Sequence, residues 1–365
     1  MPQAGRDDNR PAGLQTWMRR ARFGVSQGAR MAWYGAHGEA MKRIAARTAR
    51  TLPGEPPRIR QPETPPPSQH RMLADIARLL ARDLANVEAG LYPMPAPMPF
   101  DEPGGFASLL RRSARFLRDV PEVTRRRREE AHQEASAKDR ALPRYYQQNF
   151  HFQTDGWLSD DSAEIYDFQV EVLFTGAAAA MRRQALVPLA EMMRARDQRN
   201  LAYADIACGT GGLLRDVTRA WPRLPALGID LSEPYLRRAR ANVPSRRARF
   251  AVAQAEDLPL TDASLDAASS VYLFHELPPK VRRQVAAEIA RVLKPGGLFI
   301  LTDSLQTGDD PDYDGLLEIF PQLFHEPYYT SYLTEDFDAL FAEHGLTRED
   351  SRTAFVSKVS VFRKG

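Results

Sequence analysis

The stretch that decides the fold is Asp205-Ile206-Ala207-Cys208-Gly209-Thr210-Gly211-Gly212. It follows a short apolar run at residues 203–207 and precedes a helical pattern at 213–221, so we expect it to join a strand to a helix. Glycines there let the backbone approach a ligand closely, and the helix start offers free N–H groups. Ligands of open α/β sheets bind at this position, outside the carboxyl ends of the strands. The stretch therefore predicts a site for a nucleotide-like molecule.

Outward from this loop, short apolar runs alternate with helical patterns through the C-terminal half. Such alternation predicts βαβ units and a mostly parallel sheet that is covered by helices on both faces. The last apolar stretch, residues 353–363, has no helix after it and suits a closing antiparallel strand. The expected strands are residues 203–207, 226–229, 249–252, 267–272 and 298–302, and the expected helices are residues 213–221, 233–242 and 279–293.

The residues of the loop narrow the choice of ligand. A dinucleotide fingerprint would need a third glycine where Leu214 stands, and no Gly-Lys-Ser/Thr follows that would make a phosphate-binding loop of the Walker type. Asp205 ends the first strand, and its carboxylate would repel a pyrophosphate. An acid beside a glycine loop suits instead a ligand that carries an ammonium and a sulfonium group.

The next two strand ends supply further polar groups. Asp230 ends the second strand, 19 residues after Gly211, and a carboxylate at that distance can accept hydrogen bonds from both hydroxyls of a ribose. This arrangement selects a free ribose over a 2′-phosphorylated one. After the third strand, Gln254, Ala255 and Glu256 provide an amide side chain and a loop backbone where an adenine ring would lie.

With these residues in order, the chain resembles the class I S-adenosylmethionine-dependent methyltransferases, in particular the small-molecule branch of the ubiquinone/menaquinone C-methyltransferases. The resemblance covers residues 201–303 and is carried by residues 205–211, Asp230, 255–260 and 293–297. It implies an α/β fold with a Rossmann-like, seven-stranded, mostly parallel sheet of order 3-2-1-4-5-7-6. Residues 201–365 would form this domain, and residues 143–200 a helical cap over the cofactor.

The resemblance implies methyl transfer from S-adenosyl-L-methionine to a small, apolar acceptor, at carbon or oxygen. His275, after the fourth strand, is the expected base, although a structural hydrogen bond to a neighbouring loop is the alternative. No metal site is expected, because His275-Glu276 and His325-Glu326 both lack the second histidine of H-E-x-x-H. The expected cofactor-binding residues are Asp205, Ala207, Gly209, Gly211, Asp230, Leu231, Gln254, Ala255, Glu256 and Tyr166, and the expected acceptor-binding residues are His151, Tyr272, Tyr328 and Tyr329.

Two positions depart from the family pattern. Ala207 stands where the family often has its first loop glycine, and Gln254 stands where many members have an acid that accepts from the adenine amino group. Three alternative functions remain. They are a sensor or scaffold that binds S-adenosylmethionine without turnover, an RNA or protein methyltransferase, and an NAD-linked oxidoreductase, which Leu214 and Asp205 disfavour.

For residues 1–140 we identify no family resemblance in the sequence. Residues 1–50 carry ten Lys or Arg against three Asp or Glu, whereas the whole chain of 365 residues has a net charge of only +3. We expect basic amphipathic helices in residues 1–50, a Pro-rich solvated linker at 51–68 and a helical region at 69–142. Within that region, the run Arg125–Arg128 is expected to be a solvated helix face.

The composition of the chain limits the kinds of partner and the cellular location that we expect. The single cysteine, Cys208, excludes an internal disulfide, and no apolar stretch approaches the roughly 20 residues that span a bilayer. With no apolar leader in the first ten residues, the expected location is the cytoplasm, and a small-molecule acceptor rather than nucleic acid is the expected partner. Residues 14–50 either pack on the catalytic domain, which we favour, or lie on an anionic membrane surface. The sequence does not indicate the oligomeric state or the acceptor.

Overall fold

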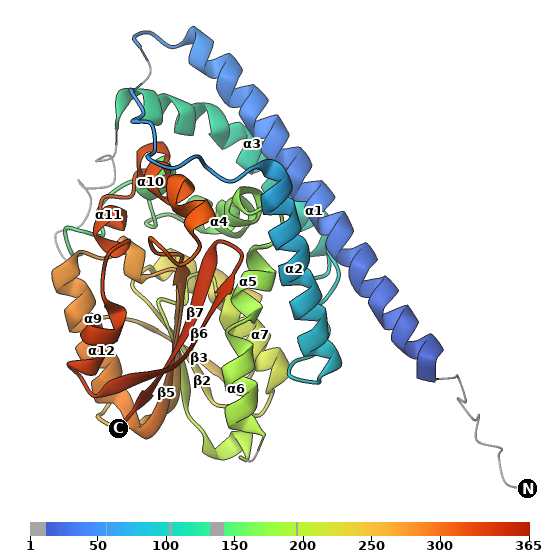
Figure 1. Ribbon diagram of the computed structural model, residues 1–365, viewed down its shortest axis with the longest axis vertical. Coiled ribbons are helices and arrows are strands. Elements are labelled where there is room, and N and C mark those ends of the chain that lie inside the picture. The colour runs from blue at the N-terminus through green and yellow to red at the C-terminus, as the bar shows by residue number, and fades with distance from the viewer. Residues whose placement is uncertain (1–11, 56, 102–103, 132–141, 195) are drawn as a thin grey trace, which may run out of the picture.

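A seven-stranded sheet of order β3-β2-β1-β4-β5-β7-β6 forms the centre of the computed structural model (Figure 1). The structure describes residues 12–55, 57–101, 104–131, 142–194 and 196–365. Strands β1 to β5 pair in parallel, and β7 runs antiparallel to both β5 and β6. The fold class and strand order expected from the resemblance are therefore confirmed. The strands are β1 (Tyr203–Ile206), β2 (Ala226–Asp230), β3 (Ala248–Val252), β4 (Leu265–Val271), β5 (Leu293–Ser304), β6 (Leu346–Ala354) and β7 (Ser357–Lys364).

Helices cover both faces of the sheet because its strands are apolar on both sides. In β5, Leu298 and Ile300 pack into one core while Phe299 and Leu301 pack into the other, as the alternation of side chains along a strand requires. The first core contains α6 (Leu186–Met193) and α7 (Gly212–Ala220), and the second contains α9 (Pro279–Val292) and α12 (Phe337–Ala342). Helix α8 (Glu233–Asn242) packs beside β2 and β3.

Two sequence expectations in this half were wrong in detail. The closing segment is a hairpin of two strands, β6 and β7, with Phe355 and Val356 in the turn, rather than one strand. The apolar spacing also predicts one helix from residue 177 to 196, but the structure divides it into α5 (Ala178–Arg183) and α6. Both errors concern the place where an element ends, which apolar patterning defines poorly.

The N-terminal residues form long helices that lie along one side of the sheet domain (Figure 1). Helix α1 (Ala12–Thr51) is a single helix that packs against α3 (Gly105–Glu129) and α4 (Asp160–Leu173), and α2 (Gln69–Glu88) packs against α5. The buried residues of α1 include Phe23 and Tyr34, so this helix packs on the rest of the protein, as favoured from the sequence. Among the described residues, no helix is both long and apolar enough to cross a membrane.

The arginine run at the end of α3 is not the solvated face that we expected. Arg126 is 5% exposed and donates hydrogen bonds to the Phe152 carbonyl oxygen and to Thr154 Oγ1. The other three arginines of the run are half-buried. The charge pattern could not reveal this, because the partners belong to the cap some 26 residues further along the chain.

The Pro-rich segment also contacts the protein. It contains no helix or strand from Leu52 to Pro67 among its described residues, as expected, but the Glu63 N–H donates to Glu318 Oε2 at 2.8 Å. Its backbone passes so close to Gly315 that a Cβ there would lie 2.0 Å from the Thr64 carbonyl oxygen. The segment therefore holds α10 (Asp314–Leu323), which forms a wall of the cavity described below. Within the region 69–142, the polar composition of residues 131–142 predicts a connector, and this stretch lies almost entirely outside the described residues.

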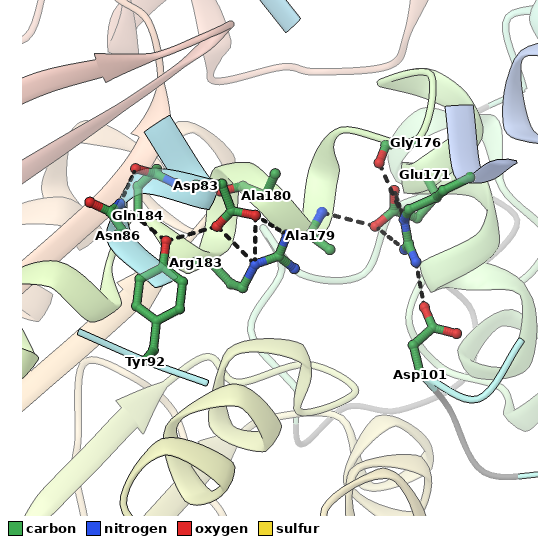
Figure 2. A network of polar contacts seen from close by, with 11 residues as sticks. Asp83, Asn86, Tyr92, Asp101, Glu171, Gly176, Ala179, Ala180, Arg183 and Gln184 are labelled. Carbon is green, nitrogen blue, oxygen red and sulfur yellow. Dashed lines mark hydrogen bonds and ion pairs between the residues drawn. The ribbon is translucent and has the colours of Figure 1, made fainter. Parts of the chain in front are cut away.

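Buried ion pairs join the N-terminal helices to the cap (Figure 2). Asp83 of α2 accepts two hydrogen bonds from the Arg183 guanidinium of α5 and one from the Tyr92 hydroxyl at 2.7 Å. Arg30 of α1 pairs with Glu171 of α4 at 2.8 Å. Because the side chains of Asp83 and Arg183 are 0% and 6% exposed, this contact fixes how α2 packs.

Candidate active site

The loop between β1 and α7 and the end of β2 form one side of a crevice. Asp230 ends β2 and accepts hydrogen bonds from the backbone N–H groups of Gly209 and Ser232, both at 2.8 Å. These bonds join the glycine loop to the carboxylate that the sequence assigned to a ribose. Gly209, Ala207 and Leu231 line the crevice with Asp230.

Aromatic side chains of the cap form the opposite wall. Two hydrogen bonds attach this wall to the loops that follow β1 and β2. Ser232 Oγ donates to the Trp157 carbonyl oxygen at 2.5 Å, and Thr210 Oγ1 donates to Asp167 at 2.7 Å. Tyr166, assigned from the sequence to the cofactor, faces this crevice. The aromatic residues that line it are Tyr145, Tyr146, Trp157, Tyr166, Tyr235 and Tyr272.

Several predicted cofactor residues do not line the crevice. Asp205 is buried and accepts from Ser269 Oγ at 2.7 Å, within the sheet. Gly211 lies against α8, where a Cβ would be 2.8 Å from Val243, so its role is close packing. Gln254 is absent from the lining, whereas its neighbours Ala253 and Ala255 are present.

The two acids beside the loop have raised pKa values. Burial raises the pKa of Asp205 to about 7, although the hydrogen bond from Ser269 opposes the shift. Burial likewise raises the pKa of Asp230 to about 6, against the hydrogen bonds from Ser232 and Gly209. Of the two, only Asp230 lines the crevice, so its carboxyl is the one that can respond to a ligand with hydroxyl groups or positive charge. In the adenine loop, Glu256 accepts from the Tyr145 hydroxyl at 2.6 Å.

A larger, apolar cavity of about 320 Å³ adjoins the crevice. Tyr166, Tyr272 and Glu276 line both spaces. A further cavity of about 260 Å³ shares Val170 and Leu173 with the apolar one and extends between α1 and α3. The predicted acceptor residues His151, Tyr272 and Tyr329 line the apolar cavity, whereas Tyr328 does not.

His275, the predicted base, lies at the polar end of the apolar cavity. Its Nδ1 is 2.5 Å from Asp303 Oδ1, a carboxylate at the end of β5 that also accepts from the Phe274 N–H. Burial would lower the pKa of His275, but Asp303 outweighs it and raises this pKa well above the ordinary value. Asp303 therefore orients the ring, and Nε2 of that ring lies 3.6 Å from Glu276 Oε1.

Two glutamates and a second histidine lie beside His275. His151 Nε2 is 3.3 Å from Glu276 Oε1 and 3.0 Å from Glu326 Oε1. Burial raises the pKa of Glu326, whereas hydrogen bonds from His151 and His275 outweigh burial and lower the pKa of Glu276. From the sequence, His325-Glu326 was considered as a metal-binding motif and rejected. Nothing in the sequence indicated that Glu326 would lie beside His151.

Several non-glycine residues of the site have left-handed backbone conformations, among them Ala207, His151 and Tyr272. The φ angles of Ala207, His151 and Tyr272 are 57°, 56° and 57°. Such conformations cost of order 1 kcal/mol each and persist where the surrounding structure enforces them, commonly at functional sites. All three residues line the crevice or the cavity, so the strain marks the same site as the loop motif.

A comparison of the sequence with known protein families matches residues 204–297 to the methyltransferase domain. The matched segment contains the glycine loop, Asp230 and the β3–β4 connection, within a sheet of the strand order expected for that family. Residues 204–297 therefore form a methyltransferase domain. The resemblance of the sequence implies S-adenosyl-L-methionine as its cofactor.

Curated relatives of this methyltransferase domain include enzymes with apolar acceptors in their names. The chain is 32% identical over 143 residues to an uncharacterized methyltransferase of Synechocystis sp., covering 39% of this chain and 65% of the relative. It is 36% identical over 147 residues to the ubiquinone/menaquinone biosynthesis C-methyltransferase UbiE of Acidiphilium cryptum, covering 38% and 54%. It is 31% identical over 118 residues to the fatty-acid O-methyltransferase of Mycolicibacterium smegmatis, covering 32% and 42%. The chain thus spans less than two thirds of the length of each of these relatives.

The crevice of the methyltransferase domain fits the cofactor in its chemistry. Asp230 presents a buried carboxylate, and Gly209 and Ala207 leave room for close backbone approach, as a ribose and an amino-acid chain require. Aromatic rings of Tyr166 and Tyr235, 5.3 Å apart, lie where they can face a sulfonium group. The sequence missed Tyr235, and it missed Asp303 although Asp303 ends a strand as Asp205 and Asp230 do.

Proposed function

We propose that the protein transfers a methyl group from S-adenosylmethionine to a small, apolar acceptor bound in the cavity beside the crevice. The observation that carries this proposal is the shared lining: Tyr166, Tyr272 and Glu276 face both the cofactor crevice and the apolar cavity. A donor in one space and an acceptor in the other would meet at these three side chains.

The cofactor supplies an electrophilic methyl group on sulfur, and the chain supplies position. Asp230 would hold the ribose, while Gly209 and the Ala255 loop would hold the methionyl and adenine parts. Apolar side chains of α4 and α10 exclude water from the cavity. Aligning donor and acceptor in this way can lower a barrier by roughly 7 to 11 kcal/mol.

His275 would receive a proton from the acceptor in its neutral form. Because Asp303 raises the pKa of His275, the neutral fraction grows as the pH rises. Asp303 contacts Nδ1, and Nε2 lies 3.6 Å from Glu276 Oε1, beside the cavity that both residues line. An acceptor hydroxyl near Nε2 would then lose its proton as the oxygen, or the carbon activated by it, is methylated.

Apolar walls favour a lipid-like acceptor over RNA or protein. The cavity is lined by Leu, Phe, Val and Met side chains, and it continues between α1 and α3 through the adjoining space. The names of related enzymes include a fatty-acid O-methyltransferase and a sterol 4-C-methyltransferase, which agree with such an acceptor. Whether carbon or oxygen is methylated depends on the acceptor.

The proposal is tested by incubating the protein with methyl-labelled S-adenosylmethionine and host extract, and then separating lipid, aqueous, protein and RNA fractions. We expect the label in the lipid fraction. Label in RNA or protein would support a macromolecular acceptor instead. Binding of the cofactor by calorimetry with no label in any fraction would support a sensor or scaffold.

A bulky side chain at the junction of the two cavities should separate acceptor turnover from cofactor binding. Val170 lines both cavities and does not line the crevice, so Val170→Trp should fill the passage and reduce labelling of the lipid fraction at least tenfold. The affinity for S-adenosylmethionine should stay within threefold. Leu110→Trp, on the exposed side of α3 (45% exposed), is the matched control. Equal labelling by both variants would contradict the assignment of the cavity to the acceptor.

The start of α1 supports membrane contact as a further part of this proposal. Trp17 is 65% exposed and lies beside Met18, Arg19 and Arg22 on the same helix. Exposed apolar side chains next to cations favour an anionic lipid surface. We expect the protein to sediment with phosphatidylglycerol vesicles and not with phosphatidylcholine vesicles, and Trp17→Glu to weaken sedimentation severalfold. Sedimentation that Trp17→Glu leaves unchanged would contradict contact through this helix.

A further inference from the structure

Three potential metal ligands meet at the polar end of the apolar cavity. His151 comes from the cap, Glu276 from the turn after β4, and Glu326 from the loop after α10. The His151 N–H contacts the His325 carbonyl oxygen at 3.4 Å, which brings the cap segment beside Glu326. His151 has the left-handed φ noted above, so its side chain is held toward the two carboxylates by a strained backbone.

The distances between these atoms are those of ligands around one ion. Bonds of about 2.0 to 2.2 Å place neighbouring ligand atoms about 3.0 Å apart in an octahedral site and about 3.3 Å apart in a tetrahedral site. His151 Nε2 lies 3.0 Å from Glu326 Oε1 and 3.3 Å from Glu276 Oε1. The three donor atoms all lie within 4.8 Å of one another.

Both carboxylates contact His151, but three of their four oxygens accept no hydrogen bond from the described residues. Glu326 is 3% exposed and Glu276 is 6% exposed. Among the described residues, none donates a hydrogen bond to either oxygen of Glu326 or to Oε2 of Glu276. A buried carboxylate without donors costs several kcal/mol unless an opposite charge compensates it, so these oxygens point to a missing cation.

We propose that His151, Glu276 and Glu326 bind one divalent cation that prefers mixed nitrogen and oxygen ligands, such as Zn²⁺ or Mn²⁺. Three protein ligands leave coordination positions open. Because His151 and Glu276 line the apolar cavity, an open position would face it and bind an oxygen of the acceptor. This role toward the acceptor rests on the proposed function, whereas binding of the ion does not.

The test measures metal binding by the full chain. Protein stripped with a chelator is titrated with Zn²⁺ alone and Mn²⁺ alone by calorimetry, and the metal content after dialysis is determined by mass spectrometry. We expect one equivalent of at least one of these ions, and a weakening of at least tenfold in Glu326→Gln and in His151→Ala. Cobalt substitution gives a second readout, because visible absorption bands of Co²⁺ should appear in the wild type and be lost in both variants.

Matched controls separate this site from surface binding and from misfolding. His70→Ala and Glu343→Gln change exposed residues outside the cluster and should bind the ion as the wild type does. The affinity of every variant for S-adenosylmethionine is measured on the same sample, so loss of metal with retained cofactor binding is informative. Less than 0.1 equivalent of metal in the wild type, or equal binding by Glu326→Gln and Glu343→Gln, would overturn the proposal. Failure of the methyl-labelling experiment would leave this result unaffected.

Discussion

Replacing Asp230 by alanine is expected to weaken the binding of S-adenosylmethionine by roughly 100-fold or more. Hydrogen bonds to a charged group contribute about 1.5 to 3 kcal/mol each, and Asp230 is placed to accept one from each ribose hydroxyl. The same carboxylate holds the Gly209 N–H at 2.8 Å, so its loss also releases the glycine loop. Isothermal calorimetry on the full chain measures the effect.

Two comparisons make the Asp230 result specific. Asp257→Ala removes an exposed acid from the neighbouring loop and should leave the affinity unchanged. Asp230→Asn keeps one acceptor oxygen and should weaken binding less than alanine does. Unchanged affinity in Asp230→Ala would show that the cofactor crevice is assigned to the wrong residues.

The pH dependence of cofactor binding should reveal the same carboxylate. Burial raises the pKa of Asp230 to about 6, so the fold without cofactor favours the protonated carboxyl. This carboxyl thus adds to the free energy of unfolding at low pH, and the contribution is lost as the pH rises through about 6. Cofactor binding has the opposite dependence, because the ribose needs the charged form. We expect the affinity for S-adenosylmethionine to decrease below pH 6. In Asp230→Asn, the part of this decrease that comes from protonation of the carboxylate should be absent.

The sequence predicted that residues of the crevice would gather at one edge of the sheet, because they are close together in the chain. The loop at 205–212 and Asp230 follow consecutive strands, and parallel strands end at one edge of a sheet. Even there, the direction of individual side chains was not predictable: Asp205 turns toward Ser269, and Gly211 packs on α8.

The acceptor side could be predicted only in part. Glu276 and Glu326 are 50 residues apart in the chain, and both lie far from His151, so no spacing rule relates the three. Asp303 could have been predicted as a site residue, because it is an acid at the end of a strand. In the N-terminal half, helical periodicity indicated the helices, but it carried no information about the cap residues that bury Arg126.

Replacing Asp83 by alanine is expected to produce the largest loss of stability, about 3 to 5 kcal/mol. Arg183 would remain as a buried charge without its carboxylate, since its side chain is only 6% exposed, and the Tyr92 hydroxyl would lose its acceptor (Figure 2). Because the pair joins α2 to α5, the helix α2 should detach first. The thermal unfolding midpoint should fall by several degrees, and amide exchange should accelerate in α2 before it does in the sheet.

A double variant separates the buried charge from the loss of packing. Asp83→Leu with Arg183→Met replaces both partners by apolar groups of similar size, and such replacements are often neutral or stabilising. We therefore expect the double variant to regain most of the stability that Asp83→Ala loses. If the double variant were as unstable as Asp83→Ala, packing and the Tyr92 hydrogen bond, rather than charge, would hold α2 in place. If Asp83→Ala lost less than about 1 kcal/mol, water would have to reach Arg183, and the packing of α2 on the cap would be looser than its burial indicates.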